Sequence, residues 1–280
     1  NRVSPIGCRL ISSNQTAFIK GRYILESVVM AHEVIHEVKK SGSQGLVLKL
    51  DYEKAYDRVN WDFLFEMLQS RGFCPKWIAW IKSTLINSTF AVRINDTNGN
   101  YFVGGKGLKQ GDPHSPFLFN LAADCLAKMI FNAQNNNLLV GLASDLIPNG
   151  VAVLQYADDT IICLEHNVDK AVNLKLLLYI FELMSGLKVN YQKSEIFIVG
   201  GDESTVKYYA ELFNCDVGSF PIKYLGMPVS YSTLRDSDWE FIVAKYLKRF
   251  EAWIGNAASM EGRLTLLDSV VTQISLYHMS

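Results

Sequence analysis

Two adjacent acidic residues interrupt an apolar stretch at positions 154–162, LQYADDTII. The flanking VAVLQY and TIICL segments have the composition of strands, so Asp158 and Asp159 are predicted at the tip of a β-hairpin. At a tip, both carboxylates can approach one point, where each raises the pKa of the other unless a cation lies between them. An acid pair in a turn is most often merely solvated, so a further acid is needed to favour a metal site.

Asp51 supplies that further acid. It follows GLVLKL, an alternating apolar segment that predicts a strand over 45–50. An acid at a strand end and an acid pair on a hairpin could hold two Mg²⁺ ions roughly 4 Å apart. Two such ions activate an attacking hydroxyl and stabilise a leaving phosphate oxygen, as phosphoryl or nucleotidyl transfer requires. The nearby Asp57 and Arg58 are interpreted as a local ion pair.

The rest of the chain alternates helical patterns with short strands. Apolar residues at steps of three and four predict a helix over 24–38, and Asn60 and Gly72 mark the start and end of another. Asn98 and Gly99 predict the turn of a hairpin over 90–103. Further helices are predicted over 75–85, 116–134, 169–186, 203–213 and from Leu234 onwards, and further strands over 194–200 and 222–229. This order predicts an α+β fold with a mainly antiparallel sheet.

Composition limits the class of protein. The 280 residues are 49% hydrophobic, enough for one large domain or a few small lobes, and the net charge of -1 argues mildly against strong non-specific binding to phosphate backbones. The five cysteines form no CxxC pair, which indicates free thiols and a reducing compartment. No signal peptide or membrane span is evident, so an intracellular protein that is neither secreted nor membrane-bound is expected. The chain begins without Met and ends in a helical pattern, so we expect a piece of a longer polypeptide.

Four stretches in order carry a family resemblance: LDYEKAYDRVNW, LKQGDPHSPFLFNL, LQYADDT and GLKVNYQKS. With SSNQTAFIKGR before them and KYLGMPV after them, the chain resembles the reverse transcriptases of LINE-type non-LTR retrotransposons. The resemblance implies a right-hand polymerase whose palm is an antiparallel sheet with helices packed on one face. It assigns 1–44 to partial fingers lacking their upstream part, 45–60 and 105–230 to the palm, 61–104 to the fingers, and 231–280 to the start of a helical thumb or connection.

The same resemblance implies RNA-directed DNA synthesis by two-metal nucleotidyl transfer. The expected partners are an RNA template, a DNA primer and dNTPs, and the oligomeric state stays open. Asp51 and Asp158 are the expected ligands of two Mg²⁺ ions, with Mn²⁺ as the alternative metal. Asp159 is the second acid of the pair, close to the metals or to the primer end. Lys193 matches the lysine that protonates the leaving pyrophosphate, although most lone lysines are simply solvated.

The remaining implied roles concern substrate contacts. Tyr56 matches the aromatic residue that lies under the incoming sugar and disfavours a ribose 2′-hydroxyl, but it could equally be a core aromatic. Gln110 and Gly111 match the loop against the incoming nucleotide, which could also be an ordinary glycine-rich turn. The segment Tyr224, Leu225 and Gly226 resembles the primer grip, or it packs a small sheet.

The chain departs from the family pattern in a few places. His114 stands where an apolar residue is usual, which suits an exposed loop or a decaying element, and Tyr156 replaces the usual Phe. The basic residues that clamp the triphosphate in the family would precede Asn1. Lys20 and Arg22 are the basic residues expected nearest to that region.

Two other functions compete with polymerase activity. HEVIH at 32–36 has the H-E-x-x-H spacing of zinc proteases, but His32 and His36 fall about 80° to 120° from the apolar stripe of their helix and no third ligand motif follows. The chain could also be an inactive reverse-transcriptase-fold fragment that only binds nucleic acid.

Overall fold

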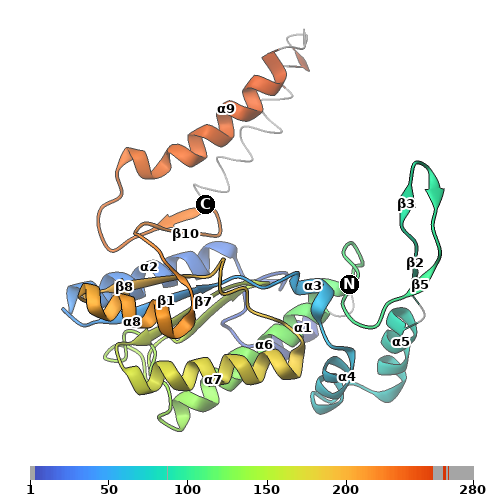
Figure 1. Cartoon of the computed structure of the whole chain (residues 1–280), viewed down its shortest axis with the longest axis horizontal. Helices are drawn as coiled ribbons and strands as arrows, with labels where there is room; N and C mark the ends of the chain where they lie inside the picture. The colour runs from blue at the N-terminus through green and yellow to red at the C-terminus, as the bar shows by residue number, and fades with distance from the viewer. Residues whose placement is uncertain (1–3, 87, 255–260, 263, 265–280) are drawn as a thin grey trace.

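A five-stranded sheet forms the centre of the computed structural model, which describes residues 4–86, 88–254, 261–262 and 264 (Figure 1). Strand β1 lies in the middle, antiparallel to β7 on one side and to β8 on the other. Strand β6 pairs antiparallel with β7, and β9 adds to β8 in parallel. The mixed α+β class and the mainly antiparallel sheet are therefore confirmed. The strands are β1 (Gly45–Leu50), β6 (Val153–Tyr156), β7 (Asp159–Glu165), β8 (Glu195–Val199) and β9 (Asp216–Val217).

Both faces of this sheet are apolar, and both are covered. Successive strand residues point to opposite faces, so Leu46 and Leu48 enter one buried cluster while Val47 enters another. Helices α6 (Ser115–Asn135) and α7 (Val168–Ser185) cover the first face, as expected. The second face is covered as well, by α2 (Ile24–Lys40) and a small hairpin, because Val47 and its neighbours there also need burial.

Local sequence signals set several helix ends. The Asn60 side chain accepts a hydrogen bond from the Phe63 N–H and so caps α4 (Trp61–Ser70), and Gly186 ends α7 at a φ of 75°. The other helices of this part of the chain are α1 (Ser4–Leu10), α3 (Ala55–Arg58), α5 (Pro75–Ile86) and α8 (Glu203–Phe213). Helices α4 and α5 precede a long hairpin that projects from the body (Figure 1).

The predicted turn of that projecting hairpin is wrong. The chain reverses at Asn95 and Asp96, which have φ values of 46° and 63°, instead of at Asn98–Gly99. Asn and Asp tolerate left-handed backbone, so the two residues form a tight two-residue loop without glycine. The Gly99 N–H instead donates to the Val92 carbonyl at 2.8 Å. The short strands are β2 (Thr89–Phe90), β3 (Arg93–Ile94), β4 (Thr97–Asn98) and β5 (Phe102–Val103).

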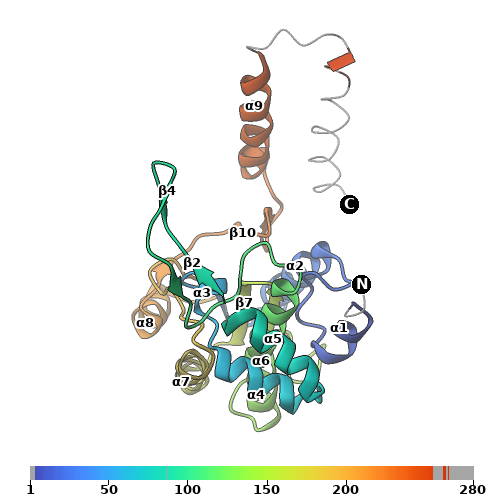
Figure 2. The same ribbon diagram turned by 90° about the vertical axis from the view of Figure 1, so that its right-hand side faces the viewer.

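The helical region near the end of the chain begins later than Leu234. A 3₁₀ turn over Asp236–Trp239 leads into α9 (Glu240–Ile254), which stands away from the sheet (Figure 2). Most of the remaining predicted helix, from 255 onwards, lies outside the described residues. Over the part of the chain that is described, no helix is sufficiently long and apolar to cross a membrane.

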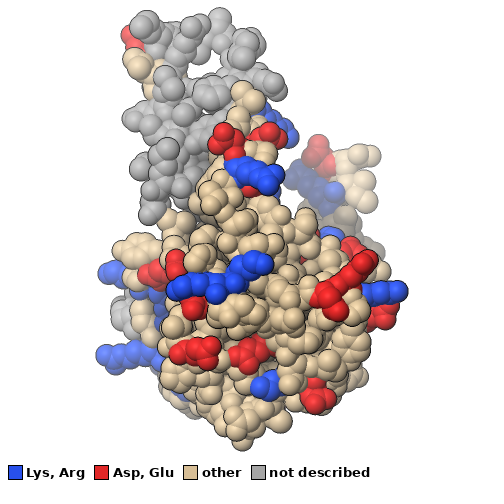
Figure 3. Space-filling model, turned by 90° about the vertical axis from the view of Figure 1, so that its left-hand side faces the viewer, with Lys and Arg blue, Asp and Glu red and all other residues tan. Residues whose placement is uncertain are grey.

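Charged side chains of both signs are interspersed on the side of the molecule drawn in Figure 3. This distribution agrees with the formal net charge of -1. All five cysteines are free thiols, as predicted.

Candidate active site

Strand pairing brings the three predicted acids to one end of the sheet. Leu50 of β1 pairs with Thr160 of β7, so the next step of the antiparallel register sets Asp51 opposite Asp159. Asp158 lies in the two-residue turn between Tyr156 and Asp159, which pair with each other. The three acidic residues are solvent-exposed. The predicted hairpin tip and the predicted strand end therefore meet at this edge.

The acids share an electrostatic environment. The pKa of Asp159 is raised, first by partial removal of its hydration and then by the nearby charges of Asp158 and Asp51. Lys49 opposes this shift, and its Nζ also lies 3.4 Å from an oxygen of Glu195. The sequence reasoning missed Lys49, although strand alternation puts it on the same face as Asp51, two residues away.

The donor chemistry of this cluster fits a hard divalent cation. Carboxylate oxygens suit Mg²⁺, which commonly takes one or two protein carboxylates and completes its shell with waters and substrate phosphates. Within the described residues, no three His, Cys, Asp or Glu side chains are arranged so that they alone could hold a metal ion. Because Mg²⁺ usually takes waters and phosphates as its further ligands, these carboxylates fit an ion that is bound jointly with a phosphate-bearing substrate.

Tyr56 lies beside these acids, on the short helix α3. Its ring stacks on that of Phe119, with centroids 4.5 Å apart and an interplanar angle of 10°. Burial, and secondarily the charge of Asp158, raises the pKa of Tyr56 to about 12. Tyr56 is therefore half-buried and lies within electrostatic range of Asp158.

The loop that carries Gln110 and Gly111 is fastened to the backbone at Tyr56. The Leu108 N–H donates to the Tyr56 carbonyl at 2.7 Å, and Gly107 packs so closely that a Cβ there would lie 2.6 Å from the Asp57 carbonyl oxygen. Only glycine fits this position, which also has a φ of 90°. Gln110 and Gly111 follow three and four residues later and are exposed.

His114, the departure in this loop, is exposed and lies at the start of α6. Its backbone N–H donates to Asp112 at 2.8 Å, and its Nδ1 is 3.4 Å from the same carboxylate. The loop accommodates a polar residue there without disturbing the helix.

The segment with Lys193 is tied to Asp51. The Asn190 N–H donates to the Asp51 carbonyl at 2.7 Å, and the Asp51 N–H donates to the Ser194 hydroxyl at 3.1 Å. Lys193 is exposed between these two anchors. The structure therefore brings its loop, although 142 residues away in sequence, to the end of β1.

A small hairpin brings the predicted primer grip near Asp159. Strands β10 (Ile222–Tyr224) and β11 (Met227–Val229) are joined by Leu225 and Gly226, with φ values of 49° and 82°. Tyr224 is buried in the cluster under α2, and its pKa is raised by that burial and then by Asp159. Tyr224 thus packs the core, whereas Leu225 and Gly226 form the half-buried turn.

The family of the chain follows from a family model for "Reverse transcriptase (RNA-dependent DNA polymerase)", which matches residues 1–229. The chain belongs to the reverse transcriptase family. Reverse transcriptases depend on divalent metal ions, in agreement with the carboxylate cluster.

Curated relatives of this reverse transcriptase chain are transposon proteins. It is 27% identical to the transposon TX1 uncharacterized 149 kDa protein of Xenopus laevis, over 99% of the chain and 21% of the relative. It is 22% identical to the Pol polyprotein of the type-2 retrotransposable element R2DM of Drosophila melanogaster, over 81% of the chain and 20% of the relative. It therefore spans about a fifth of their length. The expected kinship to retrotransposon reverse transcriptases is confirmed.

Solved structures with a similar fold are telomerases. The telomerase from Candida albicans, in a complex with a fragment of telomeric RNA, superposes with a TM-score of 0.55 over 98% of this chain and 44% of that one, at 11% identity. A truncated Candida tropicalis telomerase gives a TM-score of 0.53 over 72% of this chain and 40% of that one, at 15% identity. The expected right-hand polymerase fold is confirmed.

The HEVIH motif has no part in this site. The His32 and His36 rings stack 6.5 Å apart along α2, on residues that do not enter the buried face of that helix. Within the described residues, no third His, Cys, Asp or Glu side chain is placed to complete a metal site with them. Membership of the reverse transcriptase family accounts for the fold and the acid cluster, and no protease function is needed to explain them.

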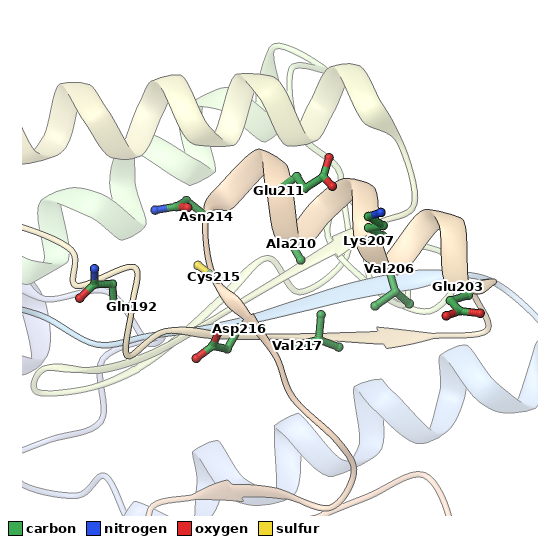
Figure 4. Close-up of a pocket in the computed structure, with 10 residues that line it drawn as sticks. All are labelled: Gln192, Glu203, Val206, Lys207, Ala210, Glu211, Asn214, Cys215, Asp216 and Val217. Atoms are coloured by element: carbon green, nitrogen blue, oxygen red, sulfur yellow. The ribbon is translucent and has the colours of Figure 1, made fainter.

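An open pocket of about 810 Å³ lies away from the acids, between α8 and β9 (Figure 4). None of the three acidic residues of the candidate site lines this pocket. Its lining side chains include both positively and negatively charged ones. Its lining residues are Gln192, Glu203, Val206, Lys207, Ala210, Glu211, Asn214, Cys215, Asp216 and Val217.

Proposed function

We propose that the polypeptide containing this chain is the RNA-directed DNA polymerase of a non-LTR retrotransposon, with an RNA template, a DNA primer and dNTPs as its partners. The observation that carries the proposal is the meeting of Asp51 with Asp158 and Asp159 at one end of the sheet, beside Tyr56. An exposed acid cluster next to an aromatic ring suits a metal-bound nucleoside triphosphate.

Asp51 and Asp158 are the proposed ligands of two Mg²⁺ ions, with Asp159 as the second acid beside them. When bound, such ions lower the pKa of a primer hydroxyl and neutralise charge on the transferred phosphate and the leaving pyrophosphate. Lys193 is proposed to protonate that pyrophosphate, and the anchoring of its loop to Asp51 supports this role.

The substrate contacts are proposed in the same way. The loop with Gln110 and Gly111 is proposed to lie against the incoming nucleotide, because the Leu108 N–H bonds the Tyr56 carbonyl while Gln110 and Gly111 stay exposed. The turn at Leu225 and Gly226 is proposed to touch the primer backbone, with Tyr224 supporting it from the core. The segments 45–60 and 105–230 form the proposed palm, 1–44 and 61–104 the fingers, and 231–280 the start of the thumb.

Primer extension tests this proposal. The full-length protein is expected to extend a DNA primer on an RNA template with dNTPs and Mg²⁺, and EDTA is expected to stop it. Salt-dependent RNA binding without any extension would contradict the proposed polymerase activity. It would favour the alternative, a reverse-transcriptase-fold fragment that only binds nucleic acid.

Shortening Tyr56 should relax the choice of sugar. In Tyr56→Ala the ring that would crowd a 2′-hydroxyl is absent, so we expect the ratio of kcat/KM for dNTP over rNTP to fall about tenfold or more. Tyr56→Phe is the matched control, because it keeps the ring stacked on Phe119 and should keep the preference. Single-nucleotide extension with each substrate measures both. An unchanged ratio in Tyr56→Ala would rule out this role.

A further inference from the structure

The turn that carries Asp158 contains a strained residue. Ala157 precedes Asp158 and has a φ of 53°, in the left-handed region where a Cβ is unfavourable and glycine is usual. A residue persists in such a conformation only where its surroundings hold it there. The backbone angles of Ala157 also set where the chain directs Asp158 next.

A buried glutamine from a distant part of the chain holds this residue. The Ala157 N–H donates to Oε1 of Gln15 at 2.8 Å, and Nε2 of Gln15 donates to the Ala157 carbonyl at 3.2 Å. One side-chain amide therefore bonds both polar groups of a single peptide residue. Gln15 has no exposed surface, and its Oε1 also accepts from the Ala17 N–H at 3.1 Å.

The segment around Gln15 is fixed against the edge of the sheet. Strand β6 is the outer strand on its side, and its Gln155 forms a parallel bridge with Gln15. The Gln155 N–H donates to the Asn14 carbonyl at 2.8 Å, and the Thr16 N–H donates to the Gln155 carbonyl at 3.0 Å. Backbone pairing thus places Gln15 next to the turn.

Arg22 and α6 hold the same segment from behind. The Arg22 guanidinium donates to the Ser12 and Ile11 carbonyls at 2.6 Å and 2.9 Å. Its donors are therefore used within the protein and do not point toward a triphosphate. Asn120 of α6 donates to the Ala17 carbonyl. These bonds leave Gln15 little freedom to move.

We infer that Gln15 is a positioning residue for the acid hairpin: its amide fixes the Ala157 peptide and thereby the placement of Asp158 relative to Asp51. This inference rests on the proposed function, because the placement matters for metal binding with substrate. Gln15 itself touches no reacting atom. Loss of its amide should make the turn more flexible and raise the Mg²⁺ concentration that extension requires. The surrounding core should remain folded.

The test compares Gln15→Leu with Gln155→Leu in the full-length protein. Gln155 is the matched control, since it is equally buried and its side chain donates to the Ala123 carbonyl of α6 without touching Ala157. Gln15→Leu is expected to raise the Mg²⁺ concentration for half-maximal extension about tenfold or more, and amide exchange over 154–160 should accelerate by a similar factor. Gln155→Leu should do neither.

Two results would overturn the inference. One is an equal shift of the Mg²⁺ requirement in Gln15→Leu and Gln155→Leu, which would make Gln15 a packing residue only. The other is unchanged exchange over 154–160 in Gln15→Leu. If the wild-type protein extends no primer, the proposed function fails, and the exchange experiment alone then decides whether Gln15 holds the turn.

Discussion

Asp158→Asn is expected to reduce primer extension by at least about 10³-fold, because the neutral amide cannot neutralise metal charge at the tip of the hairpin. Asp51→Asn should be equally severe. Asp159→Asn should cost less, since Asp51 and Asp158 are the proposed metal ligands and Asp159 is the second acid beside them. Extension rates at saturating Mg²⁺ and dNTP measure the effect. An Asp158→Asn variant that extends primers normally would refute the metal assignment.

Stability measurements separate this catalytic loss from unfolding. The three acids are exposed, and after partial burial the charges of Asp158 and Asp51 raise the pKa of Asp159, so removing the Asp158 charge relieves repulsion in the metal-free protein. The melting temperature of Asp158→Asn should therefore equal or exceed that of the wild type. Asp145→Asn is the matched control, because this exposed acid lies on the loop before β6, at the other end of the strand from the turn, and should leave extension unchanged.

Asp124→Asn is expected to lower the free energy of unfolding by about 3 kcal/mol, the largest stability effect that we predict. Asp124 has no exposed surface, and its Oδ2 accepts from Arg71 at 2.9 Å while its Oδ1 accepts from the Ser12 N–H at 2.8 Å. The substitution leaves the buried guanidinium of Arg71, whose side chain is only 8% exposed, without its counter-charge. Urea denaturation at neutral pH measures the change.

The control for this effect is an ion pair at the surface. Arg93 lies 3.0 Å from Asp96, but these side chains are 66% and 93% exposed, so Asp96→Asn should change the unfolding free energy little. A loss below about 1 kcal/mol in Asp124→Asn would contradict the account, since it would mean that the pair contributes no more than an exposed one. Ser12, which bonds Asp124, begins the segment that carries Gln15. The Asp124 variant should therefore also weaken the hydrogen bonds between Gln15 and Ala157.

Local sequence signals were sufficient where short-range chemistry decides the structure. Asn60 and Gly186 mark helix ends because their side-chain and backbone properties act over three or four residues. The same holds for the hairpin tip at Asp158 and the strand end at Asp51. Where two nearby turns were possible, local signals failed: Asn95–Asp96 and Asn98–Gly99 both tolerate left-handed backbone, and only the pairing of Ile94 with Thr97 selects the first.

The sequence by itself determined the order of the longer helices and strands, the family and the acids that define the candidate site, because those properties depend on residue type and spacing along the chain. The tertiary structure decided which distant groups meet these acids. Gln15 reaches Ala157 across 142 residues, and Lys49 faces Asp159 only once β1 and β7 have paired. The same is true of the second covered face, where α2 packs on Val47. Such contacts depend on strand register and on packing, which no periodicity within a single segment encodes.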